Sequence, residues 1–216
     1  MMTKEDPTRW YDRIARWYDL FVLGSYNRAR AATVRQLRLE PGQTVLDVAC
    51  GTGENFRFVL EKIGPTGTLI GADYSEGMLA QARRKIEKNG WQNVHLLRAD
   101  ARALSREMLA EAAAVPELRV ERVICTLGLT VVPEWEKVFA RTWEILAENG
   151  RYAIMDWYTP RRNIFTRFVN RLAASDISRR WWEPLQQQAV EFEREEMMGG
   201  LWLIVSGTKL PVAAGE

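Results

Sequence analysis

The sequence predicts an α/β fold: an open sheet of five parallel strands, extended to seven by an antiparallel hairpin at the C-terminus. Two observations carry this prediction. Between residues 44 and 157, short apolar runs alternate with helix-like stretches, a pattern that produces parallel strands joined by right-handed crossovers. After residue 188 the pattern changes to two strand-like runs joined by Gly199-Gly200, which is typical of a hairpin.

The first 40 residues are expected to form a helical lid that faces the substrate or a membrane. Helical spacing is seen for Trp10, Ile14, Trp17, Tyr18 and Phe21. A second helix is expected from about Tyr26 to Leu39, because Pro41-Gly42 stops it. The main domain is then 41–216, and it includes a separate segment at 161–188.

The remaining elements follow from the same patterns. Parallel strands are expected at 44–49, 68–73, 93–100, 122–127 and 151–157. Helices are expected at about 53–63, 76–89, 103–113 and 134–148. The hairpin strands are expected at 189–197 and 201–209.

Composition excludes several classes of protein. Of the 216 residues 47% are hydrophobic, yet no apolar stretch approaches the roughly 18 residues of a membrane span, and the N-terminus lacks the apolar core of a signal peptide. Thirty basic against 28 acidic residues leave a net charge of +2, which does not favour nucleic acid as a partner. Cys50 and Cys125 are too few for a disulfide framework and fit a reducing compartment. We therefore expect a cytoplasmic protein.

Polar residues recur where the parallel strands end. They are Asp47, Asp73, Asp100, Thr126 and Asp156, separated by 26, 27, 26 and 30 residues. Because ligands of open α/β sheets bind at the carboxyl ends of the strands, these side chains are candidates for a binding site. The alternative is that an Asp caps the following helix, which we weigh most for Asp156.

A glycine-rich turn follows the first strand. Gly51 and Gly53 allow the backbone to pass close to a ligand and turn sharply into a helix. A dinucleotide fingerprint would place Gly or Ala three residues after Gly53, where this chain has Phe56, and no phosphate-binding Lys-Ser or Lys-Thr pair follows. The turn therefore suits a nucleoside without phosphates.

Two carboxylates complete an adenosine pocket. Asp73 lies twenty residues beyond Gly53 and can accept hydrogen bonds from both hydroxyls of a ribose. Asp100 can bind the amino group of adenine, while the adjacent Ala101 offers a backbone N–H to the ring.

At this point the chain resembles the class I S-adenosylmethionine-dependent methyltransferases, which have a Rossmann-like fold. Four segments resemble family motifs in order: VLDVACGTGEN (45–55), LIGADYSEGML (69–79), LLRADARAL (96–104) and RVICTLGLTVVPEW (122–135). The resemblance implies S-adenosylmethionine as cofactor, with its methionine end held by Asp47, Ala49, Gly51, Thr52 and Gly53. It also implies Asp73 at the ribose, Tyr74 and Met78 near the adenine, Asp100 and Ala101 at the adenine edge, and the backbone around Thr126 near the sulfonium.

The N-terminal segment narrows the resemblance to a subgroup. Trp-Tyr-Asp occurs at 10–12 and again at 17–19, a heptad apart and so on one helix face. This is similar to phosphatidylethanolamine N-methyltransferases and to the C-methyltransferases of menaquinone and ubiquinone synthesis. Tyr11 and Tyr18 would cover the sulfonium, and these two with Asp19 are the catalytic candidates. The alternative is an aromatic stripe that packs in the core.

The acceptor is less defined. Residues 125–132 lack the Asn/Asp-Pro-Pro-aromatic tetrapeptide that positions a nucleobase amine, which argues against DNA methylation, and no metal-binding carboxylate cluster is evident. His95, the only histidine, lies about 16 Å along its strand from the ligand edge. Tyr11, Tyr18, Asp19 and Asp156 are therefore better placed than His95 to act as the base. The resemblance implies that 161–188 is a variable substrate-recognition insertion. Within it, segment 161–182 carries six Arg and one Asp among aromatic residues, Trp181 and Trp182 included. With 1–40, it suits an anionic membrane surface, unless its arginines form a solvated face and its tryptophans lie in the core.

Three hypotheses about function result. The first is a methyltransferase for an amphiphile, peripheral at the inner membrane face, with the ethanolamine head group of a phospholipid placed ahead of a quinone ring. The second is a methyltransferase for a soluble amine or hydroxyl compound. The third is an adenosine-binding module without catalysis. The sequence does not indicate the number of subunits.

Overall fold

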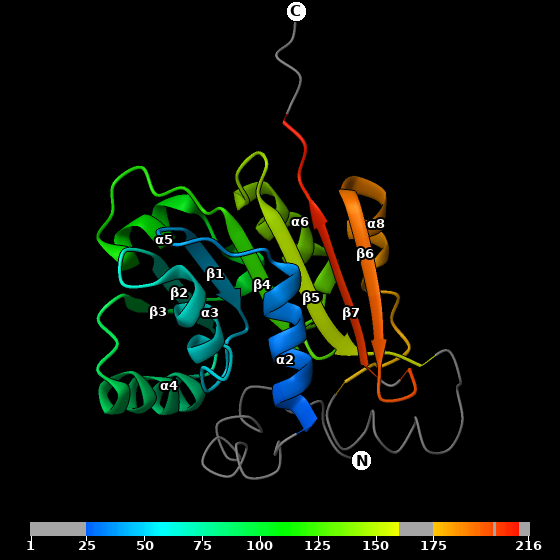
Figure 1. Cartoon of the computed structure of the whole chain (residues 1–216), viewed down its shortest axis with the longest axis horizontal. Coiled ribbons are helices and arrows are strands. Elements are labelled where there is room, and N and C mark those ends of the chain that lie inside the picture. Colours follow the sequence, from blue (N-terminus) through cyan, green and yellow to red (C-terminus); the bar gives the residue numbers. More distant parts are fainter. Residues whose placement is uncertain (1–24, 160–174, 201, 212–216) are drawn as a thin grey trace, which may run out of the picture.

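The computed structural model describes residues 25–159, 175–200 and 202–211 (Figure 1). The helices are α2 (Ser25–Gln36), α3 (Phe56–Ile63), α4 (Glu76–Asn89), α5 (Arg106–Ala113), α6 (Trp135–Ile145) and α8 (Glu183–Gln188), with a short 3₁₀ helix η1 (Ala101–Ala103). The strands are β1 (Thr44–Val48), β2 (Thr68–Asp73), β3 (Val94–Arg98), β4 (Arg122–Thr126), β5 (Arg151–Trp157), β6 (Val190–Met197) and β7 (Trp202–Thr208).

The seven strands form one sheet in the order β3-β2-β1-β4-β5-β7-β6. Strands β1 to β5 pair in parallel, while β7 pairs antiparallel with both β5 and β6. The predicted fold class is confirmed. The order reverses between β1 and β4, so the crevice at their carboxyl ends is where a ligand of an open α/β sheet binds.

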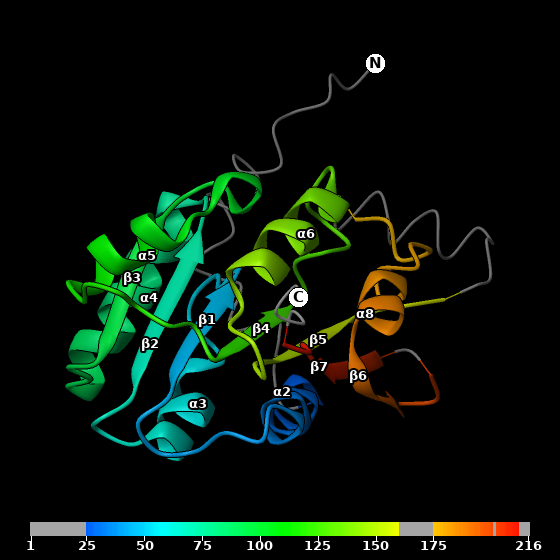
Figure 2. The same cartoon turned by 90° about the horizontal axis from the view of Figure 1, so that it is seen from above.

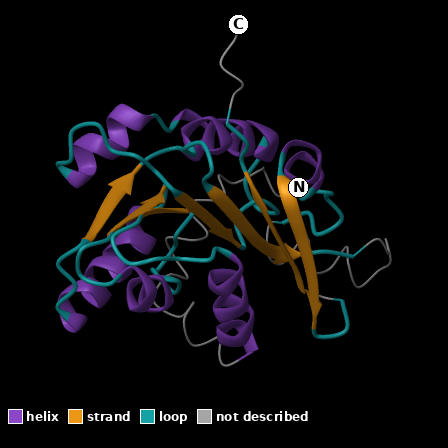
Figure 3. Cartoon of the chain, turned by 45° about the horizontal axis from the view of Figure 1, so that its top comes forward, coloured by secondary structure: helices purple, strands orange, loops and turns teal. Residues whose placement is uncertain are grey.

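Helices cover both faces of the sheet (Figures 2 and 3). On one face α5, α6 and α8 contribute to an apolar core that includes Leu109, Phe139 and Leu185. On the other face α2, α3 and α4 contribute Val34, Phe56 and Leu79 to a second core cluster. Both faces of the central strands are therefore buried, which is why those strands are apolar throughout rather than alternating.

Several elements begin later or end earlier than the sequence predicts. The first strand ends at Val48 because Ala49 and Gly51 take positive φ angles of 53° and 56°, which turn the chain. The helix expected at about 103 begins at Arg106, after Ser105 accepts a hydrogen bond from the backbone of Met108. Capping and turn geometry set these boundaries, and the spacing of apolar residues in the sequence predicts neither.

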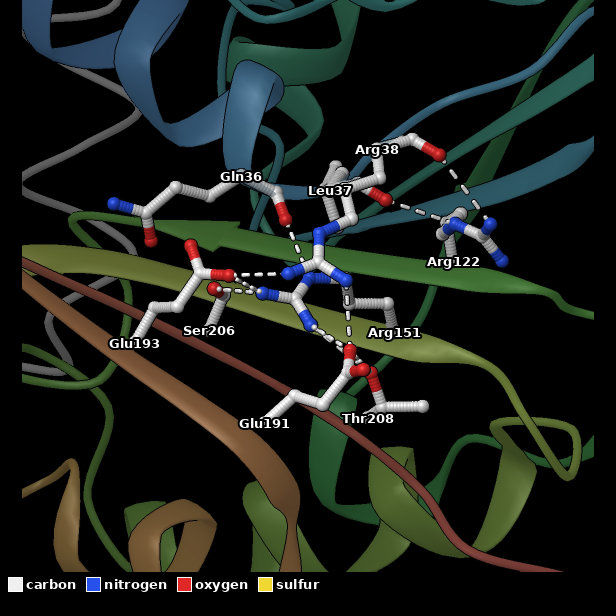
Figure 4. Close-up of polar contacts among 9 residues, drawn as sticks. All are labelled: Gln36, Leu37, Arg38, Arg122, Arg151, Glu191, Glu193, Ser206 and Thr208. Atoms are coloured by element: carbon white, nitrogen blue, oxygen red, sulfur yellow. Dashed lines mark hydrogen bonds and ion pairs between the residues drawn. The ribbon is translucent and has the colours of Figure 1, made fainter.

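The C-terminal end of α2 is held by two arginines from the sheet (Figure 4). Arg151 of β5 donates to the carbonyl of Gln36 at 2.5 Å, and Arg122 of β4 donates to the carbonyl of Leu37 at 2.9 Å. The last carbonyls of a helix have no partner within the helix, so these guanidinium groups supply the missing donors. Arg151 is only 2% exposed.

Arg38 and Arg151 connect α2 to β6. Arg38, just beyond α2, pairs with Glu191 at 2.7 Å and with Glu193 at 2.5 Å. Arg151 pairs with Glu193 at 2.8 Å and donates to the hydroxyl of Ser206 at 2.9 Å. Helix α2 is thus fixed at its C-terminal end to β4, β5 and β6, with its side packed on β5 and β7.

Replacing Arg151 should destabilise the fold. We expect Arg151→Met to lower the free energy of unfolding by about 2–4 kcal/mol, because it leaves the buried carbonyl of Gln36 without its donor and removes the ion pair with Glu193. Arg141→Met breaks an exposed ion pair with Glu144 and should cost under about 0.5 kcal/mol. Urea unfolding of both variants measures the difference, and equal losses would show that the Arg151 contacts do not hold α2.

Candidate active site

A cavity of about 310 Å³ lies at the carboxyl ends of β1, β2 and β4. This volume is at the lower end of the range of small-molecule sites, about 300–1,000 Å³. Nine of the eleven predicted cofactor residues line it: Ala49, Gly51, Thr52, Asp73, Tyr74, Met78, Asp100, Ala101 and Thr126. The structure therefore brings together side chains that span 78 positions of sequence, and their contacts with a cofactor stay predictions.

Two predicted residues do not line the cavity. Asp47 is fully buried beneath it, and its carboxylate accepts two hydrogen bonds from the side-chain nitrogen of Asn55, at 3.0 and 3.1 Å. Gly53 has φ +78°, and a Cβ there would come within 2.6 Å of the Phe56 ring. Gly53 is thus required by the turn and its packing. Asp47 has no direct contact with the cavity and instead holds the side chain of Asn55 in place.

The carboxylate of Asp73 connects two of the loops that line the cavity. One oxygen accepts from the backbone N–H of Gly51 and the other from that of Ser75, both at 2.8 Å. Each carboxylate oxygen has further lone pairs, so Asp73 can hold the glycine turn and still accept from the hydroxyls of a ribose.

Asp100 is bound by a residue that the sequence analysis did not single out. Arg102 donates to both oxygens of Asp100, with distances of 2.6–3.0 Å, and reaches Glu134 at 2.7 Å. The hydrogen bonds from Arg102 lower the pKa of Asp100, so that it is an ionised acceptor. Arg102 also lines the cavity, so it stands beside any base that Asp100 binds.

A buried polar network lies between β1, β4 and α2. Arg30 donates to the side chains of Asn55 at 2.8 Å and Thr126 at 2.6 Å, and Asn55 donates to Thr126 at 3.0 Å as well as to Asp47. All four residues are at most 6% exposed. Sequence reasoning gave Asn55 no role and missed Arg30, because a charged residue on an amphipathic helix gives no sign that it points inward.

Burial dominates the ionisation of two aspartates. Burial raises the pKa of Asp47 to about 7, although the hydrogen bond from Asn55 and the charge of Arg30 oppose the shift. Burial also raises the pKa of Asp156 to about 6. Asp156 accepts from the backbone and hydroxyl of Thr130 at 3.0 and 2.7 Å, and from the backbone of Trp157 at 2.8 Å. It holds the loop after β4 and does not line the cavity.

The acceptor side of the site is described only in part. The catalytic candidates Tyr11, Tyr18 and Asp19 lie outside the described residues, as do 160–174. His95 on β3 does not line the cavity. Within the described ranges, no cluster of side chains suits a metal ion, and no helix is long and apolar enough to cross a membrane.

The expectation that Trp181 and Trp182 face a membrane is wrong. They are 0% and 3% exposed, and Trp181 donates to the carbonyl of Trp157 at 3.1 Å. Nearby Arg179 donates to the carbonyls of Leu129 and Val132 at 2.9 and 2.8 Å. This part of the insertion is packed in the core and holds the loop after β4, because large aromatic rings gain most from burial.

Comparison with known proteins identifies the domain. Residues 45–150 match a family model described as a methyltransferase domain. The chain contains a methyltransferase domain at residues 45–150. Over 163 residues the chain is 29% identical to a demethylmenaquinone methyltransferase of Listeria welshimeri, with 73% of this chain and 65% of that protein covered. The chain thus matches about 65% of the length of this relative.

Solved structures share the fold of this methyltransferase domain. An S-adenosylmethionine-dependent methyltransferase from Aquifex aeolicus superposes with a TM-score of 0.63 at 18% identity, covering 96% of this chain and all of that one. A Haemonchus contortus phospholethanolamine N-methyltransferase, in complex with S-adenosylhomocysteine, superposes with a TM-score of 0.75 at 15% identity, covering 98% and 61%. The predicted family, enzyme class and cofactor are confirmed for the domain.

The residues of the methyltransferase site fit its cofactor. The glycine turn leaves room for a close backbone approach, since a Cβ at Gly51 would meet nothing within 4 Å. Asp73 and Asp100 offer acceptors for ribose and adenine, and Arg30 offers a buried cation. Together these groups complement a ligand that carries hydroxyls, an amino group and a carboxylate.

The raised pKa of Asp47 has a measurable consequence for stability. The folded pKa of about 7 lies above the usual value of 3.8. Below about pH 4 the Asp47 carboxyl is uncharged in both the folded and the unfolded protein, so it costs no stability. As the pH rises from 4 to 7 the unfolded chain loses this proton while the folded protein keeps it, so the free energy of unfolding falls. We expect Asp47→Asn to gain stability relative to the parent by on the order of 4 kcal/mol between pH 4 and 8.

Urea unfolding at several pH values checks this. Arg30 and Asp73 face Asp47 and are unchanged in both proteins, so the difference between variant and parent isolates Asp47. The exposed Glu111→Gln on α5 serves as control. A difference for Asp47→Asn that stays constant from pH 4 to 8 would contradict the assignment of a costly buried carboxylate.

Proposed function

We propose that the protein transfers a methyl group from S-adenosylmethionine to a ring carbon of a quinone-type aromatic acceptor. The observation that carries the proposal is the cavity at the carboxyl ends of β1, β2 and β4, with Asp73 and Asp100 at its wall. The bound cofactor supplies an electrophilic methyl group on a sulfonium.

The protein's own contribution is alignment and the exclusion of water. An in-line methyl displacement needs a nucleophile held close to the methyl carbon, and no single catalytic residue is obligatory. The Gly51 turn, Asp73 and Asp100 would hold the cofactor at three points along the cavity. Thr126 and Leu127, at the end of β4, would lie at the sulfonium.

An apolar wall of the cavity favours a flat apolar ring as the acceptor. Leu127, Val131, Val132 and Pro133 form this wall, on the loop that Arg179 and Asp156 hold in place. A zwitterionic head group desolvated against such a wall would lack polar partners for its charges, which is costly. The relative from Listeria welshimeri is named a demethylmenaquinone methyltransferase, and this supports the same class of acceptor.

N-methylation of an ethanolamine head group is the second candidate. The likeness to the Haemonchus contortus enzyme, whose structure contains phosphomonomethylethanolamine, favours it. So does the basic segment 1–40, which suits an anionic membrane. An amine acceptor has to lose a proton, a task for which Tyr11, Tyr18 and Asp19 stay candidates.

Cofactor binding is the first test. Calorimetry should show that S-adenosylhomocysteine binds the parent protein, and Asp73→Ala should weaken binding at least about tenfold, because it removes ribose acceptors and releases the Gly51 turn. Glu111→Ala removes the same charge from an exposed site on α5 and should bind like the parent. Equal affinity in Asp73→Ala would refute the assigned pocket.

A labelled-methyl assay distinguishes the acceptors. We expect label from S-adenosylmethionine to enter a reduced naphthoquinone that lacks its ring methyl group, and not phosphatidylethanolamine in vesicles with or without anionic lipid. Label in the phospholipid alone would favour the second candidate. Cofactor binding without transfer to quinol, phospholipid or soluble amines would favour a binding module over an enzyme.

A further inference from the structure

Arg30 of α2 is a buried cation whose known partners are neutral. Its side chain lines the cavity and is 4% exposed. One terminal nitrogen donates to the side chains of Asn55 and Thr126, whereas Nε has no hydrogen-bond partner among the described residues. A buried guanidinium N–H without an acceptor is costly, so this arrangement implies that an acceptor arrives with a ligand.

The acids around the cavity are engaged elsewhere. Glu54 pairs with Lys85, and Asp100 pairs with Arg102. Asp73 accepts from two backbone N–H groups, and Asp47 reaches Arg30 only through Asn55. Within the part of the chain that the structure describes, no carboxylate forms an ion pair with Arg30, so an anion that enters the cavity would be its first direct partner.

The position of Arg30 indicates which group that anion is. Its partners Asn55 and Thr126 adjoin the glycine turn and the end of β4, whereas Asp100 and Arg102 belong to the loop after β3. The predicted methionine end of the cofactor therefore lies on the Arg30 side and the adenine on the Asp100 side. The methionine end carries the only anionic group of S-adenosylmethionine, its carboxylate.

We propose that Arg30 binds the carboxylate of S-adenosylmethionine and makes the site select carboxylate-bearing adenosyl ligands over otherwise identical ones that lack it. This inference rests on the proposed use of that cofactor. Guanidinium–carboxylate hydrogen bonds are strong when water is excluded, and the network with Asn55 and Thr126 fixes the guanidinium before the ligand arrives. Binding then does not have to order a long side chain.

The experiment compares three ligands by calorimetry. S-adenosylhomocysteine carries the carboxylate, decarboxylated S-adenosylhomocysteine lacks only that group, and methylthioadenosine lacks the whole amino-acid part. We expect the parent protein to bind the first about 10- to 100-fold more tightly than the second. Arg30→Met should remove this preference by weakening only the first ligand.

Matched variants separate binding from folding. Arg30→Lys keeps the charge and should restore part of the preference. Arg28→Met removes a charge from the exposed side of the same helix and should bind all three ligands like the parent. Methylthioadenosine, which has no carboxylate, reports whether the adenosine pocket of each variant is intact.

Each outcome decides one question. If Arg30→Met weakens all three ligands equally, or weakens none, Arg30 supports the fold and the inference is wrong. If the parent binds methylthioadenosine but shows no preference for the carboxylate, the inference is wrong and the adenosine pocket stands. If the parent binds none of the three, the proposed function fails and the inference fails with it.

Discussion

The capping of α2 by Arg122 and Arg151 is the interaction on which the site depends. A helix that lies across a sheet can slide or rotate unless its end is fixed, and here two guanidinium groups bind its last carbonyls. Because α2 rises 1.5 Å per residue, Arg30 lies roughly 9 Å from the fixed end at Gln36. The capping at one end of the sheet therefore sets the position of a cation at the other.

Burial of charge is the second constraint. Asp47 and Arg30 are both removed from water, and neutral groups, Asn55 and Thr126, stand between them. A direct ion pair would have satisfied both charges and left neither available. This separation leaves Arg30 accessible from the cavity. It also leaves Asp47 buried without a direct ion pair, and the pKa of its carboxyl group is raised. Polar networks at binding sites often sacrifice stability in this way.

The sequence predicted the residues at the strand ends that line the cavity, but not the arginines that bind to them. The strand ends were found because each βα unit has nearly constant length, so Asp73, Asp100 and Thr126 recur at even spacing. Arg30 and Arg102 escaped notice because an arginine in a helix or loop reads as a solvated residue. Tertiary packing turns these arginines inward, and the pattern of a single sequence does not reveal tertiary contacts.

Tertiary packing also accounts for the opposite error at Trp181 and Trp182. Tryptophan beside arginine is typical of a membrane interface, and also of a core whose rim is charged. The two readings differ in which way the ring points, and that depends on where the chain returns after the insertion. Here the chain returns next to β5, and the indole nitrogen of Trp181 donates to the carbonyl of Trp157 at the end of that strand.

The glutamates of β6 that hold Arg38 and Arg151 have one more effect. Among the described strands, β6 has a neighbour on one side only, β7, and so it forms an edge of the sheet with unpaired backbone groups. Such an edge invites another chain to add a strand. Glu191, Glu193, Glu195 and Glu196 place charge along it, and a strand that approached would have to desolvate them. The residues that anchor the first described helix are thus also of the kind that discourages an edge strand from pairing with another chain.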